Sequence, residues 1–124
     1  MANLPINITV TPVNVSGTDV DCDFAGPNVI GNAPFLKNTD SFDITFTLVP
    51  ALGVNAFAGQ RPFCNQPNRC PRPPGGNAAP PFSLTANTGG SITVHVDPVG
   101  HKGVSFYRLN FNNNLNCDPI IIHD

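Results

Sequence analysis

Apolar and polar residues alternate along much of this chain, and a repeat of two residues is typical of half-buried β-strands. The clearest run is 41–49, whose apolar face consists of Phe42, Ile44, Phe46 and Leu48. In residues 19–24 the same pattern turns Val20, Cys22 and Phe24 toward the core. Similar patterns predict further strands at residues 5–14, 81–86, 91–96, 103–110 and 118–123, with a short one near Val29.

The composition disfavours helices over nearly the whole chain. Glutamate is absent, whereas sixteen asparagines, eleven glycines and fourteen prolines favour turns between short strands. Residues 51–58 fit either a short turn of helix or a weak strand. We therefore predict an antiparallel β-sandwich of seven or eight short strands, immunoglobulin-like in architecture, with a small β-barrel as the alternative. A length of 124 residues fits one domain that covers residues 1–124.

Two local features affect the predicted strands. Pro12 is expected to end the first strand or to place it at a sheet edge, because proline has no N–H to donate. Residues 97–103 are expected to join the strands 91–96 and 103–110 as a hairpin. The alternation changes phase within the second of these strands, and a β-bulge near Tyr107 would restore it.

The four cysteines suggest two disulfides, as is common in small domains of oxidising compartments. Of the three possible pairings we favour a local Cys64–Cys70 bridge and hence a long-range Cys22–Cys117 bridge. Four reduced thiols in a cytosolic protein are the alternative, while zinc is disfavoured because no Cys-x2-Cys spacing occurs. Disulfides favour an extracellular or periplasmic location. No signal peptide precedes the first strand, so a cytoplasmic location stays open.

The segment 61–76, RPFCNQPNRCPRPPGG, interrupts the strand pattern. Its five prolines are incompatible with a helix or a central strand, so we expect a loop over about residues 59–80. This loop holds three of the chain's six basic residues and no acid. Because ordered long loops commonly carry function, the candidate binding residues are Arg61, Arg69 and Arg72.

Charge and hydropathy narrow the choice of partner. The formal net charge of −2 is too small to indicate nucleic acid, and no apolar run approaches the roughly 18 residues of a membrane-spanning helix. The N-terminal part is acidic and the loop is basic. We therefore expect a protein partner with an anionic surface, or self-association, and we expect no cofactor.

The aspartate face, Asp19, Asp21 and Asp23, resembles the opening of a calcium-binding loop. The glycine and the glutamate that such a loop requires at its sixth and twelfth positions are replaced by Phe24 and Ile30. The simpler interpretation is a solvated strand face.

His95 and His101 are the candidate histidines for a metal site or an enzyme. A serine-hydrolase set could be assembled from Ser91, His95 and Asp97, but these residues alternate along one strand. Their side chains would then stand in a row and would not converge as a proton relay requires.

These observations favour a non-enzymatic binding or structural module with the Cys64–Cys70 loop as its recognition surface. One alternative is a small metal-binding protein or enzyme that uses His95, His101 or the aspartate face. The other is a subunit of a larger assembly that pairs through exposed edge strands.

Overall fold

The computed structural model describes residues 3–37, 39–59, 82–96, 103–106, 108–117 and 120–123. Within these ranges the chain consists of eleven strands and one short 3-10 turn, and it contains no α-helix. The predicted all-β class is confirmed. Among the described residues, no helix is long and apolar enough to cross a membrane.

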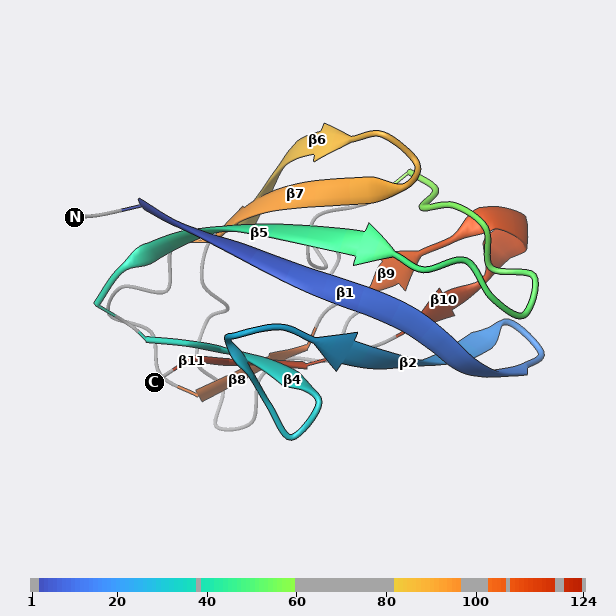
Figure 1. Cartoon of the computed structure of the whole chain (residues 1–124), viewed down its shortest axis with the longest axis horizontal. Coiled ribbons are helices and arrows are strands. Elements are labelled where there is room, and N and C mark those ends of the chain that lie inside the picture. The colour runs from blue at the N-terminus through green and yellow to red at the C-terminus, as the bar shows by residue number, and fades with distance from the viewer. Residues whose placement is uncertain are drawn as a thin grey trace.

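The strands form a curled seven-stranded sheet and a smaller four-stranded sheet, which lies below the larger one in Figure 1. The larger sheet has the spatial order β6 (Phe82–Asn87), β7 (Ser91–Val96), β5 (Ser41–Leu48), β1 (Asn3–Ser16), β2 (Asp19–Ala25), β10 (Asn116–Cys117) and β9 (Leu109–Asn110). The smaller sheet has the order β3 (Val29–Ile30), β4 (Ala33–Leu36), β11 (Ile120–His123) and β8 (Gly103–Phe106). The 3-10 turn η1 (Asn112–Asn114) follows β9.

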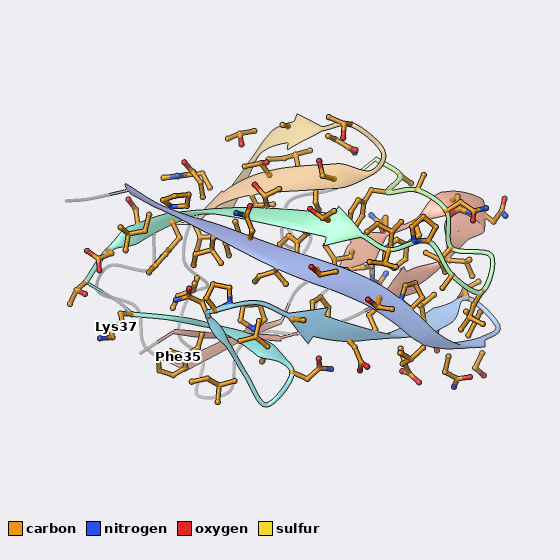
Figure 2. The ribbon with its side chains drawn as sticks, viewed as in Figure 1. Phe35 and Lys37 are labelled. Atoms are coloured by element: carbon orange, nitrogen blue, oxygen red, sulfur yellow. The ribbon has the colours of Figure 1, made fainter. Side chains whose placement is uncertain are left out.

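The core lies on one face of the larger sheet, where alternate residues of each long strand are buried. In β5 and β7 every second side chain is buried, as the alternation predicts. Phe46, which is fully buried, meets Phe24 of β2 edge to face at a centroid distance of 6.4 Å. Leu36 of β4 belongs to the same cluster, so the smaller sheet packs on this face. Phe35 and Lys37, on either side of Leu36, point away from the larger sheet (Figure 2).

Both sheets contain parallel as well as antiparallel pairs. Strands β1 and β5 run parallel over eight residue pairs, and β2–β10 and β4–β11 are also parallel. The chain leaves β1 through the hairpin to β2, passes through the smaller sheet and returns to the other side of β1 as β5. Side chains alternate in the same way in parallel and antiparallel strands. The sequence pattern therefore could not reveal these parallel pairs, and we had expected antiparallel pairing throughout.

Pro12 does not end the first strand, which continues to Ser16. Strand β5 pairs with β1 only as far as Val10, so at Pro12 the strand has β2 as its one partner. The register with β2 also shifts between Pro12 and Asn14, which marks a bulge. Proline is tolerated at such positions because no ladder hydrogen bond is lost.

The expected hairpin between residues 91–96 and 103–110 is wrong. Strand β7 pairs with β5 and β6, whereas β8 pairs with β11 in the smaller sheet. Strand β9 belongs to the larger sheet. The change of phase within residues 103–110 therefore reflects a chain that passes from one sheet to the other, and not a bulge within a single strand.

Candidate functional site

Cys22 and Cys117 lie together where β2 meets β10. Both are buried, with 8% and 5% of their surfaces exposed, and their side chains share a hydrogen bond. Neither cysteine is in a disulfide in this structure, so the predicted Cys22–Cys117 bridge is not present in it, although the two side chains lie close together. The other predicted bridge, Cys64–Cys70, lies outside the described residues.

The pKa of the Cys22 thiol is lowered from its usual value of 9.0. The main cause is the hydrogen bond from Cys117, which favours the thiolate. Burial and the negative charges of Asp21 and Asp23 act in the opposite direction, because both disfavour an additional anion. Cys22 is therefore the more readily ionised thiol for as long as Cys117 donates to it.

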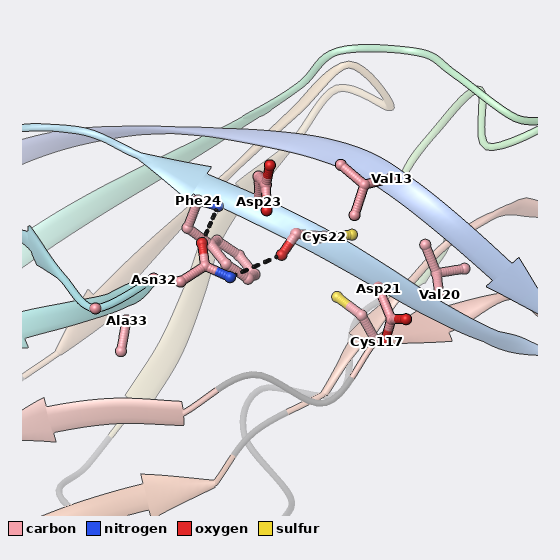
Figure 3. A pocket seen from close by; sticks show the side chains of 10 residues that line it. Val13, Val20, Asp21, Cys22, Asp23, Phe24, Asn32, Ala33 and Cys117 are labelled. Carbon is pink, nitrogen blue, oxygen red and sulfur yellow. Dashed lines mark hydrogen bonds between the residues drawn. The ribbon is translucent and has the colours of Figure 1, made fainter.

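An open pocket of about 370 Å³ adjoins the two thiols. Figure 3 shows the cysteines on its wall with Val13, which lies at the bulge of β1, and with Asn32 and Ala33 from the start of β4. The pocket gives small molecules a route to two side chains that the sheet otherwise covers.

Asn32 closes the side of β2 that faces this pocket. No strand in the described part of the chain pairs with residues 22–25 on the side away from β1. The Asn32 side chain takes the place of a strand: its Oδ1 accepts from Phe24 N–H at 2.6 Å and its Nδ2 donates to the Cys22 carbonyl at 3.1 Å (Figure 3). Gly31 and Asn32 have φ of 58° and 63°, as a two-residue type I′ turn between β3 and β4 requires.

The contact between β2 and β10 is short within the described residues. One described residue pair, Asp19 with Asn116, joins the two strands, and Asn116 N–H also donates to the Thr18 carbonyl at 2.9 Å. By comparison, β1 and β2 are joined over seven pairs. We call this short contact the β2–β10 seam, and Cys22 and Cys117 lie beside it.

The aspartate face lies where the alternation predicts, with Asp19, Asp21 and Asp23 all exposed along β2. Asp21 accepts a hydrogen bond from the Asn14 side chain at 3.3 Å. Within the described ranges, no three His, Cys, Asp or Glu side chains come together as a metal site would need. Alternate residues of a strand stand about 7 Å apart, which is wide for ligands of a single ion.

His95 forms a contact that the sequence pattern did not indicate. Its Nδ1 lies 2.9 Å from Oδ1 of Asp43 on the neighbouring strand β5, on the face of the sheet opposite the core. Ser83 of β6 is the residue paired with His95 on its other side. The backbone register therefore places Asp43, His95 and Ser83 at one level across three strands. His101 and Asp97 lie outside the described residues.

Residues 51–59, which lead toward the Cys/Pro segment, are held by asparagine side chains. Asn112 Oδ1 accepts from the N–H groups of residues 55 and 56, and its Nδ2 donates to the carbonyl of residue 53. Asn87 and Asn110 donate to the carbonyls of residues 58 and 59, at 2.9 and 3.2 Å. The segment is thus neither the helix nor the strand that was considered for residues 51–58.

Phe57 adds a hydrophobic anchor to the same segment. Its ring stacks on Phe111 at a centroid distance of 5.5 Å, and both side chains are buried. Arg61, Arg69 and Arg72 follow directly in the sequence but lie outside the described residues. We call the held segment 53–59 the loop anchor.

Sequence reasoning missed the asparagines that fix these segments. Asn32 could have been found from the Gly31-Asn32 pair between two apolar residues, which is a turn signal. The bonds of Asn87, Asn110 and Asn112 to residues 53–59 could not be predicted, because the partners are 29 to 59 residues away in the chain.

Neither the known family models nor the curated protein sequences give a match to this chain. The fold and the site define it as a small all-β protein of two sheets. Its distinguishing features are an adjacent pair of buried thiols and a rigidly held segment before the Cys/Pro stretch.

Proposed function

We propose that this protein is a non-enzymatic binding module whose β-sheet framework presents the Arg61, Arg69 and Arg72 segment to an anionic protein surface. The observation that carries the proposal is the loop anchor. Side-chain amides from β6, β9 and η1 hold the backbone immediately before this segment, and the Phe57–Phe111 stack fixes it to the core.

An anchored base favours binding because less conformational entropy is lost when a partner engages the residues that follow it. The described residues nearest to the segment are the loop anchor before it and β6 after it, and β6 pairs with β7 in the larger sheet. Three arginines within twelve residues and no acid among them supply the charge for an anionic partner.

A second copy of the chain is one such partner. The aspartate face is exposed on β2 and carries three carboxylates within five residues. Head-to-tail contact between this face and the arginine segment would account for the separation of charge along the chain.

The test compares two triple variants of the full chain. R61A/R69A/R72A removes the proposed binding charges, and K37A/K102A/R108A removes the other three cations, so both variants move the net charge from −2 to −5. Lys37 is exposed and points away from the sheets in Figure 2. Each variant is applied to a heparin column as a polyanion, and its self-association is measured by sedimentation velocity at several concentrations.

We expect the wild type and the K37A/K102A/R108A control to differ little in retention or self-association, and the R61A/R69A/R72A variant to lose most of both. Its stability should stay within about 0.5 kcal/mol of the wild type, as for other surface substitutions. Equal loss in the two variants, or retention by both, would show that the arginine segment is not the binding surface.

The contact between His95 and Asp43 favours a second candidate, an enzyme that uses His95. A carboxylate bonded to Nδ1 leaves Nε2 available as a base, and Ser83 is the next residue in that row. Treatment with a fluorophosphonate followed by peptide mass spectrometry tests this candidate. Labelling of Ser83 that disappears in H95A would support it, with S91A as the control for a neighbouring serine. No labelling above that of the denatured protein would reject it.

A further inference from the structure

Among the described residues, the β2–β10 seam has the fewest residue pairs between neighbouring strands of the larger sheet. One described pair joins β2 to β10, and two join β10 to β9. The chain beyond β10 continues to β11, the strand between β4 and β8 of the smaller sheet. A covalent link across this seam would therefore join β10 directly to β2, in addition to the contacts that hold β9 and β11.

Cys22 and Cys117 lie at the seam, 95 positions apart in the chain, with their side chains in hydrogen-bond contact. Both are also on the wall of the same open pocket (Figure 3). The hydrogen bond brings the two side chains together, and the pocket leads to both of them. The two cysteines therefore share one environment that a small reagent can enter.

We propose that Cys22 and Cys117 are a thiol–disulfide exchange site, which is oxidised by a low-molecular-weight disulfide that enters through the pocket and which then clamps β10 to β2. The site is distinct from the arginine segment, and it does not depend on the function proposed above.

The exchange has two balanced steps. The Cys22 thiolate attacks one sulfur of the external disulfide, so that a Cys22 mixed disulfide forms, the external S–S bond breaks and one thiolate leaves and takes a proton from water. The Cys117 sulfur, after losing its proton to water, attacks Cys22 Sγ and releases the second external thiolate, which is protonated in turn. The two cysteines lose two electrons and two protons, and one external disulfide becomes two thiols.

Cys22 is assigned the first attack for two reasons. Its thiolate is favoured by the donated hydrogen bond from Cys117. In addition, Cys117 is then already beside the mixed disulfide, so the second step is intramolecular and fast.

The experiment uses the full chain in a C64S/C70S background, which leaves only the two cysteines in question. The reduced protein is equilibrated in glutathione buffers of graded potential, natively and in 6 M guanidinium chloride, and the fraction of linked protein is found by acid quenching and non-reducing peptide mass spectrometry. The equilibrium constant for forming the Cys22–Cys117 disulfide should be at least about 100-fold larger in the native protein than in denaturant. If the disulfide stabilises the folded state, folding must favour the disulfide by the same free energy. A ratio within about threefold of unity would overturn the proposal.

Two further measurements test the clamp and the order of attack. Oxidation should raise the Tm of the C64S/C70S protein by about 10 °C or more, whereas the C22S and C117S variants in the same background should show no such rise. With C117S, whose hydroxyl can donate to Cys22 in place of the Cys117 thiol, the glutathione adduct on Cys22 should accumulate. With C22S the adduct on Cys117 should form at least about tenfold more slowly, because that variant lacks the Cys22 thiolate. An unchanged Tm on oxidation contradicts the clamp, and equal adduct rates contradict the assigned order. The Tm comparison needs no cysteine variant at the site itself, so it stands even if C22S or C117S does not fold.

Discussion

The side-chain oxygen of Asn32 accepts a hydrogen bond from the backbone N–H of Phe24 at 2.6 Å. Together with the bond from Asn32 Nδ2 to the Cys22 carbonyl, it satisfies two backbone groups of β2 that face no strand in the described part of the chain. A single asparagine thus completes the sheet beside the thiols, and it does so from a turn with φ of 63°.

Asn32→Gly should lower the free energy of unfolding by about 1–2 kcal/mol. Glycine keeps the left-handed backbone and removes only the amide, which leaves the two β2 groups to water or without a partner. The matched control is Asn113→Gly, because Asn113 is exposed and has a similar φ of 56°. Urea unfolding of both variants makes the measurement. Equal effects would mean that the amide contributes nothing beyond its backbone conformation.

Two substitutions of Asn112 should separate its two roles in the loop anchor. Asn112→Asp keeps an oxygen that can accept from the N–H groups of residues 55 and 56, whereas Asn112→Ala removes it. We expect faster amide hydrogen exchange at residues 55 and 56 in the alanine variant and near-normal exchange in the aspartate variant. Normal exchange in both would show that the anchor is held without this side chain.

Gly26 lies close to strand β1, and a Cβ atom there would stand 2.6 Å from the Asn7 carbonyl oxygen. Gly26→Ala should therefore force the backbone of β1 and β2 apart, at a cost of about 1–3 kcal/mol in unfolding free energy. Gly90→Ala is the control, because a Cβ there meets nothing within 4 Å. The control should stay within about 0.5 kcal/mol of the wild type in the same denaturation assay.

Ile44 and Ile30 offer a matched comparison of buried and exposed positions. Ile44 is fully buried in β5, while 60% of the surface of Ile30 is exposed in β3. Ile44→Val should destabilise the protein by about 0.5–1.5 kcal/mol because it leaves a cavity in the core. Ile30→Val should have little effect on stability. The measurement is thermal unfolding, and equal losses of stability in the two variants would contradict the assignment of Ile44 to the core.

The lowered pKa of Cys22 predicts a pH dependence of stability in the reduced protein. Between the folded pKa and the unfolded value near 9.0, the unfolded thiol still holds its proton and the folded one does not. The free energy of unfolding should therefore rise with pH across that interval, and the contribution should be lost as pH falls through the folded pKa. The difference between C64S/C70S and its C22S derivative, measured under reductant at several pH values, isolates this contribution; a flat difference would contradict the lowered pKa.

Cys117→Ala supplies a second test of the same cause. Without the donated hydrogen bond, burial and the charges of Asp21 and Asp23 remain, and these raise the pKa of Cys22. Alkylation of Cys22 by iodoacetamide near neutral pH should become slower, and its pH profile should move to higher pH. An unchanged profile would mean that Cys117 does not set the ionisation of Cys22.

The sequence by itself determined the strand content and the buried face of the long strands. The side chains at every second position of β5 and β7 are buried as the pattern predicted, and Cys22 faces inward with Val20 and Phe24. These features follow from a repeat of two residues within one strand, so they need no knowledge of the neighbouring strand. The number and spacing of the cysteines also predicted that Cys22 and Cys117 pair, though as a disulfide and not as two thiols.

Only the tertiary structure decided which strands are neighbours and which side chains come into contact between them. The parallel pairing of β1 and β5, the passage of the chain between sheets from β8 to β9, and the contact of His95 with Asp43 all depend on strand order. Alternation specifies a face but no partner, since a strand buries the same side chains against any neighbour. For the same reason the sequence could not predict the partners of Asn32 and Asn112. Their amides bond to backbone groups on other segments, and such contacts produce no periodic pattern in the sequence.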